Sequence, residues 1–515
     1  MSLQDRAYRG AGWSGLSGLF SNGLELLKYV ILARLLEASD FGLLAMAMVI
    51  IGISRIFADG GTSNAVIHFR NQDHQQLSTL FWINIMAGTG LYLLVLITAP
   101  LFAQFYEQPE VTTLLRLGGL VLPLFATGAL YEVMLRKSLS FKIITISEGL
   151  GAVTGFVTAV VMALWGWGVY ALIWSQIVLS ATMTLVYVVH GMKSWRPSFA
   201  FRPAKVISHL RFGIFQMGER GLNVYATRID QLIIGRFFGP EILGAYHIAW
   251  QIILFPVMRL IPLLNRVALP VFSSRQDDDG ILRNAYLKLM TGVITMLSPL
   301  FIIATLTAPW LVPVLFGDGW ELTIRLIPLM AMLGFLKMLG NPSNNIVLSK
   351  GRADIMFYWN LVLAIINTAV FLIGAYHSIF MLLGLYALIT IFYFIVGHWI
   401  MVYQLIGLTW SRFFNHIIPC FVALGLPWGI TWIFRNLISG VWSFDRLIAV
   451  PVMENLREVF RAWNDISLWY EHAMTGDIIA LICVATLFLI LYIPIARYFQ
   501  STLIMEALRA LRPNT

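Results

Sequence analysis

Charged side chains stand within stretches of this chain that are otherwise apolar enough to cross a membrane. The cations are Lys28, Arg55, Arg220, Arg228, Arg259 and Arg266, and they outnumber the anions, which are Glu25, Asp59, Glu219 and Asp230. A charge at that depth is costly, so such residues normally face the protein interior or a water-filled path. The planar arginine side chain can bind two oxygens of one phosphate group. A cavity lined by these cations favours a large anion, and we predict that they form a substrate site.

Two of the cations have an acidic residue one turn away, which leaves a structural alternative open. Arg55 and Asp59 are at i,i+4 spacing, and Glu25 and Lys28 are at i,i+3 spacing, where helical side chains meet. For these two pairs, an internal ion pair explains the spacing as well as a place in the cavity lining does. The cavity is favoured for the arginines without such a partner, which are Arg220, Arg228 and Arg259. The candidates for proton or sodium coupling are Glu25, Asp59, Glu219 and Asp230, and the sequence does not rank them.

The helix expected over residues 209–238 places its polar residues along one side. At about 100° per residue, one stripe contains Gln216, Glu219, Arg220, Asn223, Thr227, Asp230 and Gln231. The opposite side is apolar and contains Phe215, Leu222, Ile229 and Ile233. This pattern predicts a membrane helix with one hydrated face and one apolar face.

A second polar stripe near the N-terminus matches the first when the chain is shifted by about 200 residues. Residues 33–36 then lie over 235–238, and Gly42 lies over Gly244. The shift carries Ser14, Ser17, Ser21, Glu25 and Lys28 onto Gln216, Glu219, Asn223, Thr227 and Asp230. Such internal symmetry is typical of transporters built from two related halves, with the substrate site between them. Lys28 and Asp230 become equivalent, and either they pair with each other or each is satisfied within its own half.

The composition is that of a membrane protein. Of the 515 residues, 59% are hydrophobic and 12% are charged, whereas soluble domains have about 25% charged residues. The formal net charge of +9 is explained by its placement in loops and does not predict nucleic-acid binding. The sequence has no glycine-rich phosphate-binding motif and no metal-ligand spacing. Cys420 and Cys483 lie in apolar runs, so we expect no disulfide, and we expect no cleaved signal peptide.

Apolar runs of about 20 residues predict about fourteen membrane-spanning helices. Their expected bounds are 12–35, 41–66, 79–104, 111–135, 146–165, 168–190, 209–238, 242–268, 286–316, 322–348, 355–376, 379–404, 412–434 and 477–499. Basic residues gather in alternate loops, and the short loops between them hold acidic residues without lysine or arginine. The positive-inside rule therefore places both termini in the cytoplasm. Arg34 and Arg236 end equivalent helices, so we expect both to anchor the exterior interface.

One long exterior loop covers residues 435–476. Within it, Val452, Leu456, Val459, Phe460 and Trp463 recur at helical spacing. This pattern predicts an amphipathic helix on the outer membrane surface. A lid packed on other exterior loops explains the same pattern equally well.

Two stretches carry a resemblance to a known family. They are ARLLEASDFGLLAMAMVIIGISRIFADGGTSNAVI at 33–67 and ERGLNVYATRIDQLIIGRFFGPEILGAYHIA at 219–249. They resemble the polysaccharide transporter branch of the multidrug/oligosaccharidyl-lipid/polysaccharide (MOP) flippase superfamily, in particular repeat-unit flippases of the colanic-acid and teichuronic-acid type. The resemblance implies an all-α polytopic membrane protein with a MATE-like arrangement. Its parts are pseudo-symmetric six-helix bundles at 1–190 and 209–405, a cytoplasmic linker at 191–208 and two further helices within 406–515.

The resemblance also implies a function without an enzymatic reaction, a cofactor or a metal. The chain is expected to move an undecaprenyl-diphosphate-linked oligosaccharide repeat unit from the cytoplasmic to the periplasmic leaflet of the bacterial inner membrane, by alternating access. This step serves the assembly of surface polysaccharide or exopolysaccharide. The implied partners are the lipid-linked oligosaccharide and membrane lipids, with the polysaccharide polymerase machinery as a further candidate and no nucleic acid.

Two other functions remain open. A cation-coupled drug antiporter of the same superfamily needs surplus carboxylates for organic cations, and the surplus of arginine argues against it. A membrane glycosyltransferase would place catalytic carboxylates at an exterior loop, where Glu37 and Asp40 lie. An acidic residue, Glu241, recurs near the related turn, which favours a structural role for these residues.

Overall fold

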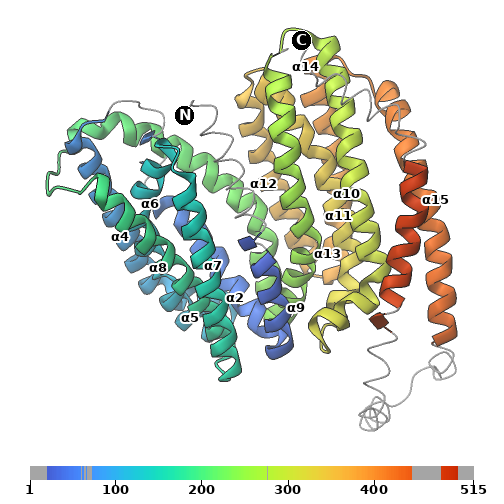
Figure 1. The fold of residues 1–515 in the computed structure, drawn as a ribbon, viewed down its shortest axis with the longest axis horizontal. Helices are drawn as coiled ribbons and strands as arrows, with labels where there is room; N and C mark the ends of the chain where they lie inside the picture. Colours follow the sequence, from blue (N-terminus) through green and yellow to red (C-terminus); the bar gives the residue numbers. More distant parts are fainter. Residues whose placement is uncertain are drawn as a thin grey trace. The chain divides into compact units, whose positions relative to one another are not determined.

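The described part of the chain is helical and contains no β-strand, in agreement with the predicted fold class (Figure 1). The structure is a computed structural model. It describes residues 20–21, 23–58, 61–62, 65–66, 72–274, 276–442, 477–478 and 480–496.

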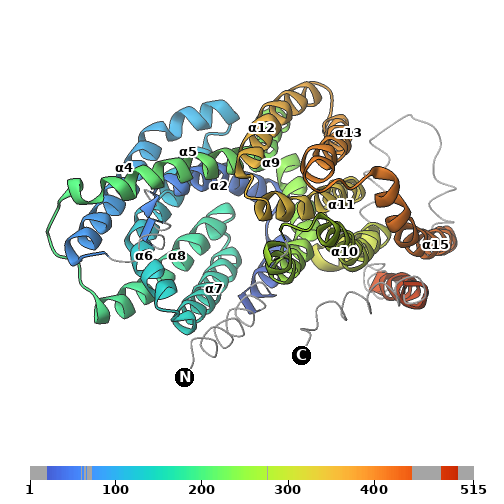
Figure 2. The ribbon, with the colours of Figure 1, turned by 90° about the horizontal axis from the view of Figure 1, so that it is seen from above.

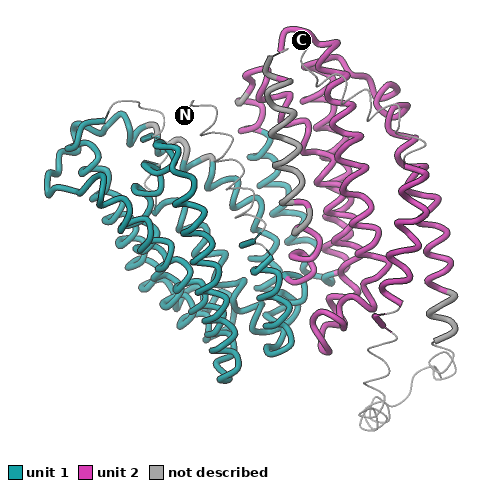
Figure 3. Tube along the Cα trace, in the orientation of Figure 1, with its two compact units in different colours: residues 1–247, 359–379 teal, residues 248–358, 380–515 magenta. Residues whose placement is uncertain are grey.

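The contacts within the chain divide it into two units, which Figure 3 shows in different colours. Unit 1 contains Met1–His247 and Trp359–Ile379, and unit 2 contains Ile248–Tyr358 and Phe380–Thr515. The boundary between units falls inside a helix and outside the linker at 191–208. The bundles at 1–190 and 209–405 follow from the sequence repeat, and that division stays a prediction.

Unit 1 begins with apolar helices whose bounds follow the hydrophobic runs closely. A helix over residues 23–35 precedes α2 (Ala38–Ala58), α4 (His74–Tyr106), α5 (Glu110–Gly118), α6 (Val121–Lys137), α7 (Phe141–Leu164) and α8 (Val169–Ser194). The single span predicted at 111–135 consists of two successive helices, α5 and α6, because a turn at residues 119–120 interrupts it. The division at residues 165–168 between α7 and α8 is confirmed.

The start of α4 is fixed by hydrogen bonds and holds the linker that follows α8. Asp73 caps the helix by accepting the backbone N–H of Gln76 at 2.6 Å, and its own N–H donates to the Gln76 side chain. The Lys205 ammonium lies 3.1 Å from the same carboxylate. The Gln76 N–H, followed by Lys205, lowers the pKa of the Asp73 carboxyl and keeps it ionised. Farther along α4, the indole of Trp82 donates to the carbonyl of Ser198 at 2.9 Å.

Helices α7 and α8 lie side by side in both views of the ribbon (Figures 1 and 2). Small residues follow one buried face of α7, namely Gly151, Gly155, Ala159 and Ala163. Small side chains allow two helix backbones to approach closely, which is the usual basis of helix association in a membrane. The pairing of α7 with α8 is therefore encoded by residue size at four-residue spacing.

Helix α9 (Ile207–Ser274) is two helices joined at Gly239, whose φ of 80° and ψ of −178° are not helical. The join agrees with the two spans predicted at 209–238 and 242–268. The first of these helices packs on α12 (Ala353–Ala375): the Tyr225 and Thr368 hydroxyls are 3.1 Å apart. The rings of Phe237 and Tyr376 lie 5.4 Å apart between centroids. These contacts explain why residues 359–379 belong to unit 1.

Residues that are equivalent in the sequence repeat meet each other where α2 begins and the second helix of α9 begins. A Cβ atom on Gly42 would lie 1.8 Å from the carbonyl oxygen of Pro240. A Cβ atom on Gly244 would lie 1.7 Å from the carbonyl oxygen of Ala38. The repeat carries Ala38 onto Pro240 and Gly42 onto Gly244, so each contact is the counterpart of the other. Only glycine permits this backbone approach at either position.

Unit 2 contains the remaining helices. They are α10 (Asp279–Phe316), α11 (Glu321–Ser349), α13 (Ile379–His398), the π-helical turn η2 (Trp399–Tyr403), α14 (Gln404–Ile406), α15 (Trp410–Trp442) and a helix over 480–496. The last helix is held to α10, because the Tyr492 hydroxyl donates to the carbonyl of Thr295 at 2.8 Å. The His398 ring lies 4.0 Å from that of Trp410 between centroids, and its Nε2 atom is 3.2 Å from the carbonyl oxygen of Leu408, so it packs within unit 2.

Ten helices among the described residues are long and apolar enough to cross a membrane. The total of about fourteen spans remains a prediction. Helix α15 continues past Arg435 to Trp442, so the exterior loop predicted to begin at 435 is helical over its first residues. The amphipathic helix predicted within this loop falls at residues 443–476, outside the described part of the chain.

Candidate functional site

The first helix of α9 presents two exposed arginines, Arg220 and Arg228. Between them, the side chains of Asn223 and Thr227 are exposed as well. Arg228 Nη1 donates to Gln231 Oε1 at 3.2 Å. Neither arginine forms an ion pair with any residue that the structure describes. Two of the six cations predicted for a substrate site, Arg220 and Arg228, therefore lie on an accessible polar surface of this helix.

The polar stripe of α9 is not hydrated along its whole length. Asp230 and Gln231 are buried, with relative exposures of 5% and 6%. Asp230 accepts a hydrogen bond of 2.5 Å from the Tyr246 hydroxyl. Tyr246 lies on the second helix of α9, beyond the join at Gly239. The prediction of one continuous hydrated face was wrong at this end, because the chain turns there and covers Asp230.

Lys28 is also buried, and it pairs with neither of the partners considered from the sequence. Its relative exposure is 6%, and its Nζ atom lies 5.7 Å from the centre of the neighbouring Tyr29 ring. The described residues contain no ion pair between Lys28 and Glu25 or between Lys28 and Asp230. In this conformation the Tyr246 hydroxyl is a hydrogen-bond partner of Asp230. Asp230 therefore has its partner within its own half of the chain, which was the second of the two alternatives.

Arg55 lines a separate cavity of about 110 Å³ within unit 1. Its guanidinium carbon lies 4.2 Å from the centre of the Phe125 ring, in a cation–π contact. The polar side chains around it come from α6 and α8 and include Glu132, Gln176 and Ser180. A cavity of this size holds a small polar group rather than an oligosaccharide.

Glu25 is exposed on the helix over residues 23–35, and the other predicted site residues cannot be placed as side chains. The side chains of Glu219, Arg259 and Arg266 lie outside what is described, although α9 includes their backbone, and Asp59 lies outside the described residues altogether. Arg236 ends the first helix of α9 and forms an ion pair of 2.8 Å with Glu107. Arg236 therefore has a structural partner, as an anchoring role requires.

Lys337 is a membrane cation absent from the predicted site. It lies midway along α11 and is exposed, and its Nζ atom is 4.7 Å from the Trp250 ring centre and 4.9 Å from that of Tyr386. Two aromatic faces stabilise an ammonium group by cation–π attraction. A lone lysine within the apolar run of residues 329–339 is a signal that sequence reasoning could have used.

Comparison with solved structures defines the class of protein. The chain matches the "Lipid II flippase MurJ, inward closed conformation" with a TM-score of 0.65 and 12% identity, over 96% of this chain and 99% of that one. It matches an inward-facing multidrug resistance MATE family transporter of the MOP superfamily with a TM-score of 0.53 and 12% identity, over 78% of this chain and 95% of that one. The fold is that of the MOP-superfamily membrane transporters.

Sequence comparison then specifies the family. The family model described as "Polysaccharide biosynthesis protein" matches residues 31–325. The chain is 30% identical to the teichuronic acid biosynthesis protein TuaB of Bacillus subtilis (strain 168), over 82% of this chain and 89% of that one. It is 28% identical to the lipopolysaccharide biosynthesis protein WzxC of Escherichia coli (strain K12), over 82% and 87%. It is 26% identical to the succinoglycan biosynthesis transport protein ExoT of Rhizobium meliloti (strain 1021), over 71% and 74%. The chain belongs to this polysaccharide biosynthesis family, which confirms the resemblance drawn from its sequence.

Proposed function

We propose that this multi-pass membrane protein is a flippase for a lipid-linked oligosaccharide. Its substrate is an undecaprenyl-diphosphate-linked repeat unit, which it moves from the cytoplasmic to the periplasmic leaflet of the bacterial inner membrane by alternating access. The observation that carries the proposal is the exposed pair Arg220 and Arg228 on α9, which has no carboxylate partner among the described residues, in a chain of the polysaccharide biosynthesis family.

The two arginines provide the chemistry that a diphosphate requires. Each guanidinium can donate two parallel hydrogen bonds to phosphate oxygens. Arg220 and Arg228 are eight residues apart, about two helical turns, so one extended anionic group could contact both in turn. The exposed side chains of Asn223 and Thr227 between them supply weaker hydrogen-bonding groups suited to sugar hydroxyls. The remaining predicted cations, Arg259 and Arg266 among them, are proposed to extend this anion-binding surface.

Cation-coupled drug transport is less well supported. Binding an organic cation requires accessible carboxylates, and Asp230, the one acidic member of the α9 stripe whose side chain is described, is buried against Tyr246. The exposed charge described on that stripe is Arg220, which is positive, and Arg228 beside the stripe is positive as well. Glu25 and Asp59 remain proposed candidates for ion coupling.

The orientation belongs to the same proposal. Basic loops alternate with acidic loops along the chain, which supports cytoplasmic termini. The polysaccharide polymerase machinery, which would use the flipped unit, is proposed as a partner. Partition of the chain into related halves at 1–190 and 209–405 supports a rocking movement of one half against the other.

Complementation of a strain that lacks this gene tests the proposal. The strain is expected to accumulate a lipid-linked oligosaccharide on the cytoplasmic leaflet, and the intact gene is expected to clear it. Arg220→Ala and Arg228→Ala should each abolish clearance at unchanged protein level, and lysine at either position should restore part of it. The matched control is Arg116→Ala, which removes an exposed arginine from α5. Full clearance by both alanine variants would exclude these arginines from the site.

A further inference from the structure

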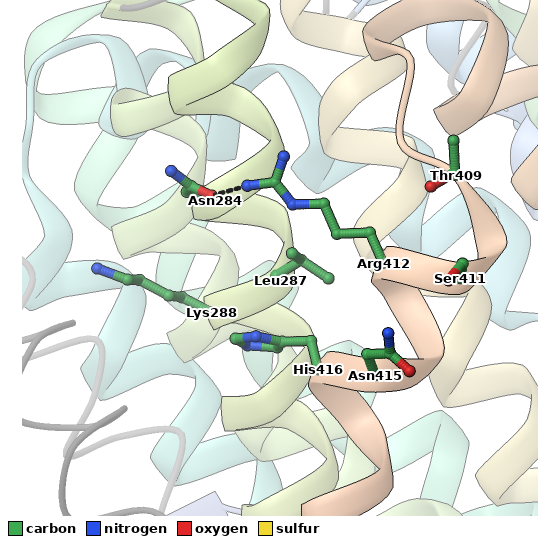
Figure 4. A pocket seen from close by; sticks show the side chains of 8 residues that line it. All are labelled: Asn284, Leu287, Lys288, Thr409, Ser411, Arg412, Asn415 and His416. Carbon is green, nitrogen blue, oxygen red and sulfur yellow. Dashed lines mark hydrogen bonds between the residues drawn. The ribbon is translucent and has the colours of Figure 1, made fainter.

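Unit 2 contains a polar cavity that the proposed transport site does not use. It has a volume of about 650 Å³ and lies where α10 and α15 pack together near their N-terminal ends. Its lining residues are Asn284, Leu287 and Lys288 from α10, Thr409 just before α15, and Ser411, Arg412, Asn415 and His416 from α15. Figure 4 shows these side chains around a common space. A cavity of several hundred cubic ångströms is within the range of small-ligand sites.

The lining is basic and contains no acidic residue. Arg412 reaches from α15 toward α10, and its Nη2 atom donates to Asn284 Oδ1 at 3.0 Å (Figure 4). The other nitrogens of the guanidinium make no hydrogen bond with a residue that the structure describes. Lys288 Nζ has no hydrogen-bond acceptor and no acidic partner among the residues that the structure describes. The cavity therefore holds two positive charges in excess.

His416 adds a buried polar atom without a partner. Its Nε2 atom is inaccessible to solvent and makes no hydrogen bond within the described part of the chain. A buried ring nitrogen that lacks a partner costs free energy unless a ligand or water satisfies it. In Figure 4 the ring points from α15 toward Leu287 and Lys288 of α10. This atom is closed off from the cavity in this conformation, so the donors that a ligand there could reach are the two cations.

Two of the three acidic residues at the start of α10 are engaged elsewhere, and the third, the exposed Asp277, does not line the cavity. Asp278 caps α10 by accepting the backbone N–H groups of Gly280 and Ile281. Asp279 forms an ion pair of 2.7 Å with Lys350. Neither lines the cavity, so the positive charge of Lys288 and Arg412 is available to a ligand.

The position of the cavity favours a lipid as the source of the anion. Ser411 and Asn415 line it, and the same side of α15 continues through Ile418, Val422 and Leu426 at spacings of three and four residues. These three side chains are exposed, with relative exposures of 51%, 42% and 54%. In a spanning helix, exposed apolar side chains contact acyl chains. One lipid could thus place its headgroup in the cavity and a chain along this stripe.

We infer that this cavity binds the phosphate-bearing headgroup of an anionic phospholipid, in the leaflet where α10 and α15 begin. A basic pocket between transmembrane helices is a common form of lipid headgroup site. The bound phosphate would accept hydrogen bonds from Lys288 and Arg412. The lipid would join α15 to α10 without taking part in substrate transport.

Native mass spectrometry of the full-length protein, titrated with phosphatidylglycerol, tests the inference. The double variant Lys288→Ala/Arg412→Ala is expected to bind this lipid at least about tenfold more weakly than the unchanged protein. The matched control is Arg196→Ala/Arg352→Ala, which removes two exposed cations outside the cavity and should leave binding unchanged. The charge-preserving variant Lys288→Arg/Arg412→Lys should retain most of the binding, which separates loss of charge from loss of folding.

Two further titrations identify the source of the phosphate. Phosphatidylcholine, which carries no net charge, should bind the unchanged protein more weakly than phosphatidylglycerol, and millimolar inorganic phosphate should not displace the lipid. Equal loss of binding in the cavity variant and the Arg196/Arg352 control would overturn the inference. Displacement of phosphatidylglycerol by inorganic phosphate would overturn the assignment to a lipid.

Discussion

Replacement of Gly42 by alanine is expected to destabilise the protein strongly, because this residue touches backbone rather than side chains. The new Cβ atom would lie 1.8 Å from the carbonyl oxygen of Pro240. The equivalent change, Gly244→Ala, would place a Cβ atom 1.7 Å from the carbonyl oxygen of Ala38. A backbone carbonyl cannot rotate away as the end of a side chain can. The two helices would have to separate by about 1.5 Å to restore an ordinary contact distance.

The size of the effect follows from the cost of overpacking. Added methyl groups in packed interiors typically cost about 1–3 kcal/mol of unfolding free energy, and we expect the upper end of this range here. For each variant, that corresponds to a fall in unfolding temperature of about 3 °C in a chain of 515 residues. Thermal unfolding of the purified protein in detergent, followed by intrinsic tryptophan fluorescence, measures it.

Matched glycines on the same helices provide the controls. Gly52 on α2 and Gly218 on α9 have no atom within 4 Å of the position of an added Cβ. Alanine at either site should leave the unfolding temperature unchanged or raise it slightly, since alanine is favoured over glycine within a helix by about 1 kcal/mol. Equal unfolding temperatures for Gly42→Ala and Gly52→Ala would refute the close approach of the α2 and α9 backbones at Gly42 and Gly244.

Three other changes separate structural from functional roles. Tyr246→Phe leaves the buried Asp230 carboxylate without its hydroxyl partner and should lower stability by about 1–3 kcal/mol; an unchanged unfolding temperature would show that the bond is unimportant. Glu107→Gln removes an exposed ion pair with Arg236 and should cost less than about 1 kcal/mol, with full complementation, so loss of export would assign Glu107 to the transport site. Lys337→Ala should reduce export at unchanged protein level and Lys337→Arg should retain it, because arginine preserves the charge between the rings of Trp250 and Tyr386; equal export by both variants would remove the cation from function.

Most helices could be predicted because a membrane span is a local property of the sequence. The apolar runs at 79–104, 146–165 and 168–190 correspond to α4, α7 and α8. The repeat also identified Gly42 and Gly244 as equivalent before their contacts were known. Each glycine contacts the backbone carbonyl of the residue that precedes the other glycine by four positions. This contact depends on how the two helices cross, and alignment of the chain with itself does not determine the crossing.

The candidate site was harder to predict because partners come from distant parts of the chain. The exposed position of Arg220 follows from the helical periodicity of one segment, whereas Arg228 is exposed although it lies outside the predicted polar stripe. The burial of Asp230 depends on Tyr246, which lies beyond the join at Gly239 on another helix. Lys337 was missed, and its aromatic neighbours stand on two other helices. Local periodicity thus predicts which face is polar, and tertiary packing decides which polar residues remain accessible.

The most direct test of the central claim is lipid-linked oligosaccharide flipping by the purified protein in vesicles. An undecaprenyl-diphosphate oligosaccharide is placed in one leaflet, and its arrival in the other is detected by a glycan-binding protein that cannot cross the membrane. The account predicts flipping by the unchanged protein and by Arg116→Ala, and loss of flipping by Arg220→Ala and Arg228→Ala. Vesicles that flip no oligosaccharide but take up an organic cation against a proton or sodium gradient would contradict it.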